Sequence, residues 1–166
     1  TGNGSMSHMS AELLADMQQI KVINVPYRGG SQVFTAMFGN QVPLYFATPA
    51  TAVAQIKEGR LVPLAYTDRR RSKSLPQVPT LDELGVKGFE TVNWYGLLGP
   101  VNLGEAAAER VANDVSAVLR QRSVIDAFEK TGTQAGGVSR AAFGAYLAVE
   151  TVRWSKVIRT RGIKAD

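Results

Sequence analysis

The sequence predicts an α/β fold, and two observations lead to this prediction. Short β-branched runs alternate with helical segments, and these strand–turn–helix units recur about every 20 residues, which is typical of parallel βαβ architecture. The 166-residue chain is 45% hydrophobic and 20% charged, a composition of folded globular proteins rather than of disordered ones. We therefore expect a parallel-dominated sheet with helices, followed by a helical C-terminal region.

The composition excludes several kinds of chemical site. The chain has no cysteine, which rules out disulfides, zinc–thiolate sites, iron–sulfur clusters and thiol nucleophiles. Its single histidine, His8, cannot form a multi-histidine metal centre. No apolar run reaches the roughly 18 to 20 residues that a bilayer crossing requires. We therefore predict no metal site.

The first part of the chain supplies the α/β units. After an initial helix from Ser5 or Ser7 to Gln19, we expect strands at 22–25, 42–46 and 61–66 and helices at 32–38 and 50–57, with Ser31 as an N-cap. Loops that follow parallel strands gather at one edge of a sheet, where ligands bind. The loops expected to meet there are 1–5, 26–30 and 47–51.

The second part of the chain is predominantly helical. Residues 68–90 are irregular, with one short helix capped by Thr80, and 91–98 form an apolar strand. Amphipathic periodicity then predicts helices at 104–122, 123–130 and 139–161. The change from α/β alternation to helices places a boundary near residues 95–100.

Two glycine-containing loops are candidates for anion binding. In Thr1-Gly2-Asn3-Gly4-Ser5, the glycines let the backbone approach a ligand, while amides of the following helical turn and the Ser5 hydroxyl can donate to it. This loop matches neither a dinucleotide-binding fingerprint nor a Walker A loop. Tyr27-Arg28-Gly29-Gly30-Ser31 is a second loop of this kind. From the residues alone, a plain loop or cloning remnant at the first and a tight turn at the second remain alternatives.

Other groups of residues are weaker indications of function. His8 and Glu12 have the spacing of two metal ligands, but no third ligand accompanies them. A small serine hydrolase would require Ser5 or Ser7 to be activated by His8, without an elbow motif around either serine. The net charge is +5, and the one dense basic run is Arg69–Lys73. In a basic nucleic-acid-associated protein, this run would have to form part of the surface that binds the nucleic acid. We interpret this run as a solvated loop.

Several motifs occur in a fixed order and together carry a family resemblance. They are Thr1-Gly-Asn-Gly-Ser-x-Ser-His8, Val25-Pro-Tyr-Arg-Gly-Gly30, Gly39-Asn-Gln-Val42, Ile56-Lys-Glu-Gly-Arg-Leu61, Leu75-Pro-Gln-Val-Pro-Thr80 and Trp94-Tyr-Gly-Leu-Leu-Gly-Pro100. The combination resembles the Bug (TctC-like) family of solute-binding receptors of tripartite tricarboxylate transporters. The resemblance continues through Trp154-x-x-Val157-Ile158 to Gly162-Ile163-Lys164, and it favours native opening residues over a tag.

This resemblance implies a periplasmic binding protein type II-like fold with a ligand clamped between two lobes. A receptor of this family has no enzymatic activity and no cofactor. It binds a small carboxylate in the periplasm, delivers it to the membrane permease subunits of the transporter, and has a signal peptide in its precursor. Nucleic acid is not an expected partner. The ligand-binding residues implied here act through backbone amides and polar side chains, and they are Thr1, Gly2, Asn3, Gly4, Ser5, His8, Tyr27, Gly29, Gly30 and Thr48.

The sequence also departs from the family pattern. Residues 1–95 resemble the second, ligand-binding lobe, and 96–166 resemble the crossover strand and the C-terminal helices that return to the first lobe. We expect the remaining lobe, and the strand that should precede Thr1, to be missing, so that strand edges and apolar helix faces are exposed and favour a homo-oligomer through the C-terminal helices. Ala47 replaces a residue that is often Asp, Asn or Ser in the family, and Thr48 retains part of that polarity.

Overall fold

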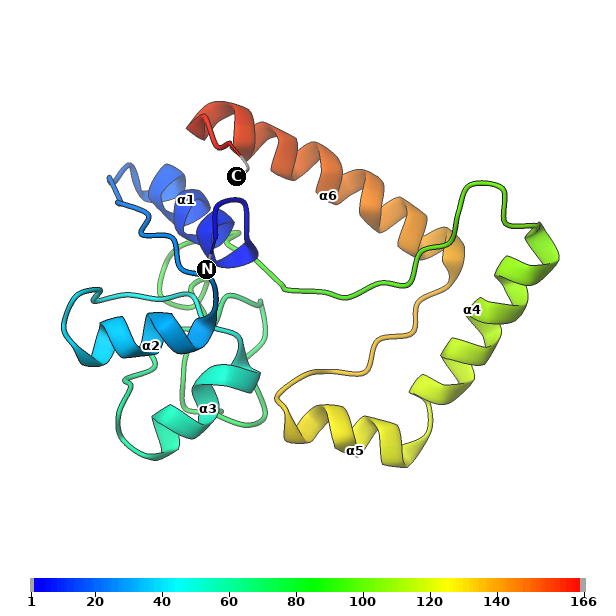
Figure 1. Cartoon of the computed structure of the whole chain (residues 1–166), viewed down its shortest axis with the longest axis horizontal. Helices are drawn as coiled ribbons and strands as arrows, with labels where there is room; N and C mark the ends of the chain where they lie inside the picture. Colours follow the sequence, from blue (N-terminus) through cyan, green and yellow to red (C-terminus); the bar gives the residue numbers. More distant parts are fainter. Residues whose placement is uncertain (1, 165–166) are drawn as a thin grey trace. The chain divides into compact units, whose positions relative to one another are not determined.

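The computed structural model describes residues 2–164, which form six α-helices joined by turns and extended segments (Figure 1). The helices are α1 (Met6–Gln18), α2 (Gly30–Phe38), α3 (Pro49–Lys57), α4 (Glu105–Leu119), α5 (Arg122–Lys130) and α6 (Arg140–Arg161). The chain divides into two compact units, one made of Thr1–Asn93 with Ser155–Asp166 and the other of Trp94–Trp154. The six longer helices expected from periodicity are confirmed to within a few residues at each end.

Local signals in the sequence account for where the first three helices begin. The Ser5 side chain caps α1 by accepting a hydrogen bond from the backbone N–H of His8 (3.4 Å). Pro49 occupies the first turn of α3, where its missing N–H costs nothing. The expected N-cap of α2 was Ser31, but the structure places Gly29 there, because Gly30 already has helical geometry. The helix therefore begins directly at the glycine pair.

The segments expected as strands are extended, yet they do not pair with one another. Within residues 2–164 the β pairing is limited to one isolated parallel bridge, between Tyr66 and Thr80. The apolar side chains of Ile23 and Val62 are 92% and 81% exposed. Strands that follow one another in sequence need not be neighbours in a parallel sheet, so helical connections alone do not bring their edges into contact. The expected sheet is thus present here as separate extended segments.

The short helix expected after Thr80 is a single turn instead. Thr80 and Glu83 form a reciprocal capping box: the Thr80 N–H donates to Glu83 Oε2 (2.8 Å), and Thr80 Oγ1 accepts from the Glu83 N–H (3.1 Å). Arg71 Nε donates to the same carboxylate (2.8 Å), and this hydrogen bond holds the pKa of Glu83 below its ordinary value. Gly85, at φ +99°, ends the turn before a helix can propagate.

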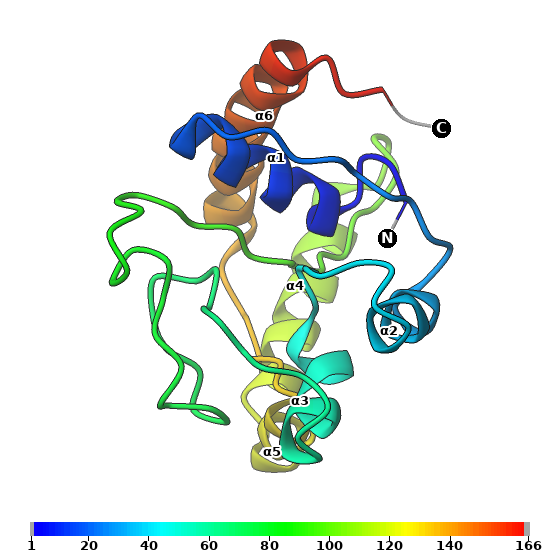
Figure 2. The same ribbon diagram turned by 90° about the vertical axis from the view of Figure 1, so that its left-hand side faces the viewer.

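The core of the first unit gathers around α1 and α2. Apolar side chains from these helices are buried together with Ala52 of α3 and with residues from the later loops: Met9, Leu13, Ala15, Val33, Phe34, Ala36, Leu75, Val78 and Phe89. Within this core, Ser10 Oγ donates to Thr91 Oγ1 (2.8 Å), so the buried hydroxyls are satisfied. The last turn of α6 lies beside α1 in both views (Figures 1 and 2), where Arg161 Nε donates to Glu12 Oε2 (2.7 Å).

The second unit has no comparable core. Trp94 packs edge-on against the rings of Phe143 and Tyr146 on α6, with centroids 5.6 and 5.7 Å away. Arg140 pairs with Glu105 at the start of α4 and holds the pKa of that carboxyl below its ordinary value. Neither α4 nor α5 contains a buried residue.

None of the helices within residues 2–164 has both the length and the apolar character of a membrane span.

Replacing Phe89 with alanine tests the core of the first unit. Its side chain is 1% exposed, and truncating a buried phenylalanine leaves a cavity that costs about 3–5 kcal/mol. We expect Phe89→Ala to lower the free energy of unfolding in urea by that amount. Ile23→Ala is the control, with an expected change within about 0.5 kcal/mol because Ile23 is exposed. Equal losses in the two variants would contradict the assignment of the core.

Candidate functional site

A hydrogen bond from Ser7, just after the first predicted loop, reaches Phe46, just before the third. Ser7 Oγ, in the first turn of α1, donates to the backbone carbonyl of Phe46 (2.7 Å), which lies just before Ala47 and Thr48. Thr48 is the N-cap of α3, and its Oγ1 lies 3.2 Å from Thr51 Oγ1. The starts of α1 and α3 are therefore held close together, although 39 residues separate the two bonded partners in sequence.

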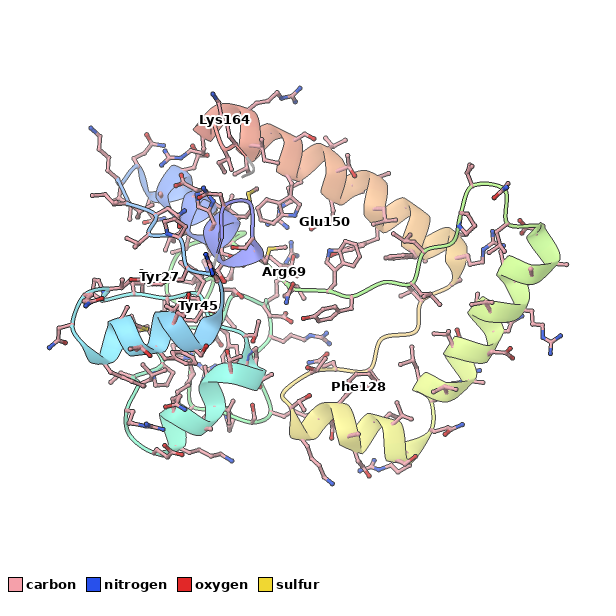
Figure 3. The ribbon with its side chains drawn as sticks, viewed as in Figure 1. Tyr27, Tyr45, Arg69, Phe128, Glu150 and Lys164 are labelled. Atoms are coloured by element: carbon pink, nitrogen blue, oxygen red, sulfur yellow. The ribbon has the colours of Figure 1, made fainter. Side chains whose placement is uncertain are left out.

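The second predicted loop lies against the third through Gly30. A Cβ built on Gly30 would lie 3.4 Å from the Tyr45 hydroxyl and 3.9 Å from Thr51 Cγ2, so the glycine allows a close approach. The ring of Tyr45, which is labelled in Figure 3, packs edge-on against Phe34 of α2 with centroids 5.7 Å apart. Tyr45 and Thr51 were not among the predicted site residues, although Tyr45 lies in the predicted strand 42–46 and Thr51 in the predicted loop 47–51.

The first loop also contacts the segment that leads into the second. Asn24 Nδ2 donates to Asn3 Oδ1 (2.8 Å), and Asn24 precedes Tyr27 by three positions. These contacts, made within or directly next to the three predicted loops, bring the loops close together. The starts of α1, α2 and α3 lie at this meeting point, which we call the three-loop site, defined by residues 2–5, 27–30 and 45–51.

The helix starts give the three-loop site its electrostatic character. The amides of the first helical turn carry a partial positive charge, and anions are favoured there. Neither Gly29 before α2 nor Thr48 before α3 provides a side-chain hydrogen bond to its helix, whereas Ser5 caps α1. The start of α2 therefore offers backbone donors to a ligand. This combination of amides and hydroxyls suits an anion such as a carboxylate.

His8 is the predicted residue with the most enclosed surroundings. Its side chain is 9% exposed, Nδ1 accepts a hydrogen bond from the Gly4 N–H (3.2 Å), and Nε2 lies 3.6 Å from Glu12 Oε1. The other Glu12 oxygen accepts from Arg161, so this carboxylate belongs to an ion pair. Among residues 2–164 no group of three or more metal-ligating side chains occurs. Arg161, and not a third metal-ligating side chain, is therefore the partner of the pair formed by His8 and Glu12.

The other predicted site residues lie at or near the surface. Thr1 falls outside the described residues, and Gly4 is exposed. The remainder are half-buried at the helix starts: Gly2, Asn3, Ser5, Tyr27, Gly29, Gly30 and Thr48. All of the described ones belong to the first compact unit.

The contacts of the serines do not support a serine hydrolase. Ser5 Oγ accepts from the backbone of His8, and Ser7 Oγ donates to Phe46, so neither hydrogen bond involves the imidazole ring. The basic run is likewise engaged in local pairs, because Arg69 binds Glu90 (2.8 Å) and Arg71 binds Glu83 (2.8 Å). These contacts leave both alternative functions without support.

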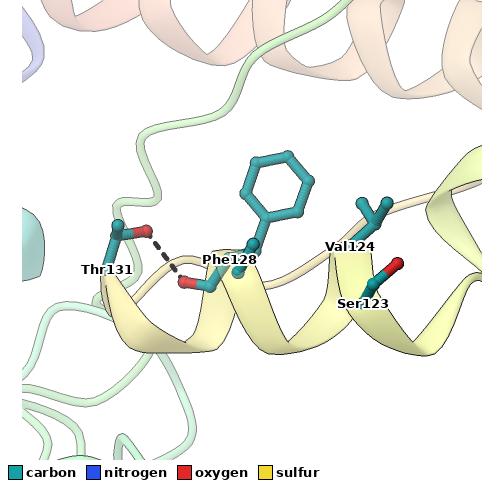
Figure 4. A pocket seen from close by; sticks show the side chains of 5 residues that line it. Ser123, Val124, Phe128 and Thr131 are labelled. Atoms are coloured by element: carbon teal, nitrogen blue, oxygen red, sulfur yellow. Dashed lines mark hydrogen bonds between the residues drawn. The ribbon is translucent and has the colours of Figure 1, made fainter.

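A surface depression on α5 offers no comparable chemistry (Figure 4). It is lined by Ser123, Val124, Ala127, Phe128 and Thr131. Thr131 Oγ1 donates to the backbone carbonyl of Phe128 (2.8 Å), which satisfies the hydroxyl within its own helix end. No charged side chain lines this depression, so the three-loop site remains the candidate.

Residues 1–163 match the family model described as the tripartite tricarboxylate transporter family receptor, TctC. The chain belongs to this receptor family. A relative, the UPF0065 protein in the TAR-I ttuE-ttuC′ intergenic region of Agrobacterium vitis, is 30% identical over 164 residues. The match covers 97% of this chain but 47% of that relative, so the chain spans about half of the relative's length.

Solved structures confirm the expected α/β binding-protein lobe. The structure of R. palustris Rpa4515 with adipate superposes with a TM-score of 0.84 at 29% identity, over 96% of this chain and 54% of the other. MatC (Rpa3494) from Rhodopseudomonas palustris with bound malate gives a TM-score of 0.80 at 25% identity, over 93% and 54%. The TctC-type chain therefore has the fold of one part of such receptors.

Substitutions at two glycines test the geometry of the three-loop site. Gly4 has φ +73°, whereas Gly29 has an extended backbone, and an added Cβ meets no atom within 4 Å at either position. Backbone strain alone should therefore distinguish them. We expect Gly4→Ala to lower the free energy of unfolding by about 1–2 kcal/mol and Gly29→Ala to change it by less than about half as much. Chemical denaturation measures both, and a larger loss at Gly29 would contradict the loop geometry.

Proposed function

We propose that this chain is the ligand-binding part of an extracytoplasmic solute receptor that captures a small carboxylate for a tripartite tricarboxylate-type transporter. The observation that carries the proposal is the match of residues 1–163 to that receptor family. Two structural neighbours contain the dicarboxylates adipate and malate. In this proposal the ligand is released unchanged to the permease subunits, so the chain is a receptor in the periplasm and not an enzyme.

The three-loop site would hold one carboxylate group of the ligand. Amides at the start of α2, next to Gly29 and Gly30, would donate to its oxygens, and the hydroxyls of Ser5 and Thr48 would complete the shell. Charge-assisted hydrogen bonds of this kind contribute about 1.5–3 kcal/mol each. The full set of proposed ligand residues is Thr1, Gly2, Asn3, Gly4, Ser5, His8, Tyr27, Gly29, Gly30 and Thr48.

Residues near Ala47 would discriminate between ligands. Ala47 brings no polar group, so an amino or hydroxyl substituent of the ligand finds no partner at that position. The hydroxyls of Thr48 and Thr51 lie next to it and are exposed to an entering ligand's second polar group. We therefore favour plain dicarboxylates over amino acids as ligands.

The domain organisation in this proposal follows the family architecture. Residues 1–95 form the second lobe, and 96–166 form the crossover and the helices that return to the first lobe. The solved relatives are about twice as long as the matched part. A strand from the remaining portion of such a receptor would pair with the extended segments 22–25 and 42–46, whose apolar side chains include the exposed Ile23.

Titration with carboxylates tests the ligand class. We expect adipate and malate to shift the amide NMR signals of residues 2–5 and 27–30, with a Kd of about 1 mM or weaker because the chain provides one side of the pocket. Ser5→Ala should weaken binding by removing a hydroxyl, and Gly29→Val by blocking the backbone approach. The matched control ligand is hexane-1,6-diol, which has the length of adipate without its charge.

The titration has a defined contrary result. Shifts confined to Arg69–Lys73, or equal shifts with the diol, would show that the three-loop site does not recognise carboxylates. Unchanged affinity in both Ser5→Ala and Gly29→Val would contradict the assignment of these residues.

The same proposal includes self-association through the C-terminal helices. Val111, Val115 and Val118 of α4 and Val149 and Val152 of α6 are all exposed, and large exposed apolar patches favour association. We expect light scattering at tens of micromolar (roughly 10–50 µM) to give the mass of a dimer or larger species. Replacing Val149 and Val152 with lysine should reduce that mass to that of a monomer. A monomeric parent chain would contradict this part of the proposal.

A further inference from the structure

We propose that His8 is a positioning residue that fixes the loop Gly2–Ser5, and that the Glu12–Arg161 ion pair selects the His8 tautomer that makes this possible. The role in ligand binding rests on the proposed function, but the arrangement itself is a property of the chain alone. It connects a loop at the start of the first helix to the end of the last helix within the same compact unit.

The Gly4 hydrogen bond determines which ring nitrogen of His8 acts as the acceptor. A backbone N–H can only donate, so Nδ1 of His8, 3.2 Å from the Gly4 nitrogen, must be the acceptor and carries no proton. The neutral ring then has its proton on Nε2. A proton on Nδ1 would place two donors against each other and would release the Gly4 peptide.

Glu12 favours the required tautomer. Its Oε1 lies 3.6 Å from Nε2, so the carboxylate stabilises a proton on that nitrogen and leaves Nδ1 free to accept. The side chains of His8 and Glu12 are 9% and 12% exposed, so water competes little with this interaction. Glu12 is the acidic group on α1 that faces the ring, and Arg161 is the charged group that faces Glu12 from α6.

Arg161 holds the carboxylate in place. Its Nε donates to Glu12 Oε2 at 2.7 Å, and the two residues are 149 positions apart in sequence. The series Gly4, His8, Glu12, Arg161 is therefore a continuous set of polar contacts. Through it, the last turn of α6 sets the conformation of a loop whose amides and hydroxyl belong to the three-loop site. His8, one of the proposed ligand residues, thus contributes to binding by positioning Gly4.

NMR of the 166-residue chain without ligand tests the tautomer directly. We expect the long-range ¹H–¹⁵N spectrum of His8 to show a protonated Nε2 and an unprotonated Nδ1. Glu12→Gln should move the ring toward the Nδ1–H form, because the new amide can donate to Nε2. Arg161→Met should also shift the tautomer ratio by releasing Glu12. Arg159→Met is the matched control, since Arg159 is an exposed residue of the same helix.

Hydrogen exchange at Gly4 tests the positioning role. Exchange of the Gly4 amide should be about fivefold faster in His8→Leu, which removes the acceptor, and His8→Asn should restore protection because its side-chain oxygen lies near the position of Nδ1. A protonated Nδ1 in the parent chain, or equal Gly4 exchange in the parent and His8→Leu, would overturn the inference. If these results hold while adipate fails to perturb the three-loop site, the proposed function is wrong and the positioning arrangement stands.

Discussion

The candidate site depends on how the polar side chains of α1 anchor this helix to distant parts of the chain. Ser7 binds the Phe46 carbonyl, Ser10 binds Thr91 within the core, and Glu12 binds Arg161 at the end of α6. A buried or half-buried polar group that lost such a partner would carry a desolvation cost, so each contact restricts where α1 can lie. The position of α1 in turn determines where its capping loop points.

This constraint explains how a site made of loops has a defined shape. Loops that have no regular sheet beneath them ordinarily vary in conformation, but here contacts at the helix starts hold each loop in place. Gly30 adds a steric condition, because its missing side chain lets α2 approach Tyr45 and Thr51. The backbone donors and hydroxyls that converge there follow from these few contacts. Backbone donors and hydroxyls at helix starts suit an anion, which is the kind of ligand that we propose for this site.

The sequence predicted the helices well because their signals are local. Ser5 as a cap, Pro49 in a first turn and the apolar stripe of α4 are each visible within a few residues. Strand pairing is non-local, so the pattern could identify extended segments but not their partners. The Thr80 cap predicted from the sequence is present, but it precedes a single turn that ends at Gly85 rather than a short helix. The contact between Glu12 and Arg161 had no sequence signal, since nothing local relates residues so far apart.

A crystal structure of the chain grown with adipate would test the central claim most directly. The account predicts a carboxylate group within hydrogen-bond distance of the amides at the start of α2 and of the Ser5 or Thr48 hydroxyl, with the His8 ring still accepting from Gly4. Adipate bound at the basic segment Arg69–Lys73, with the three-loop site unchanged and free of ligand, would contradict it.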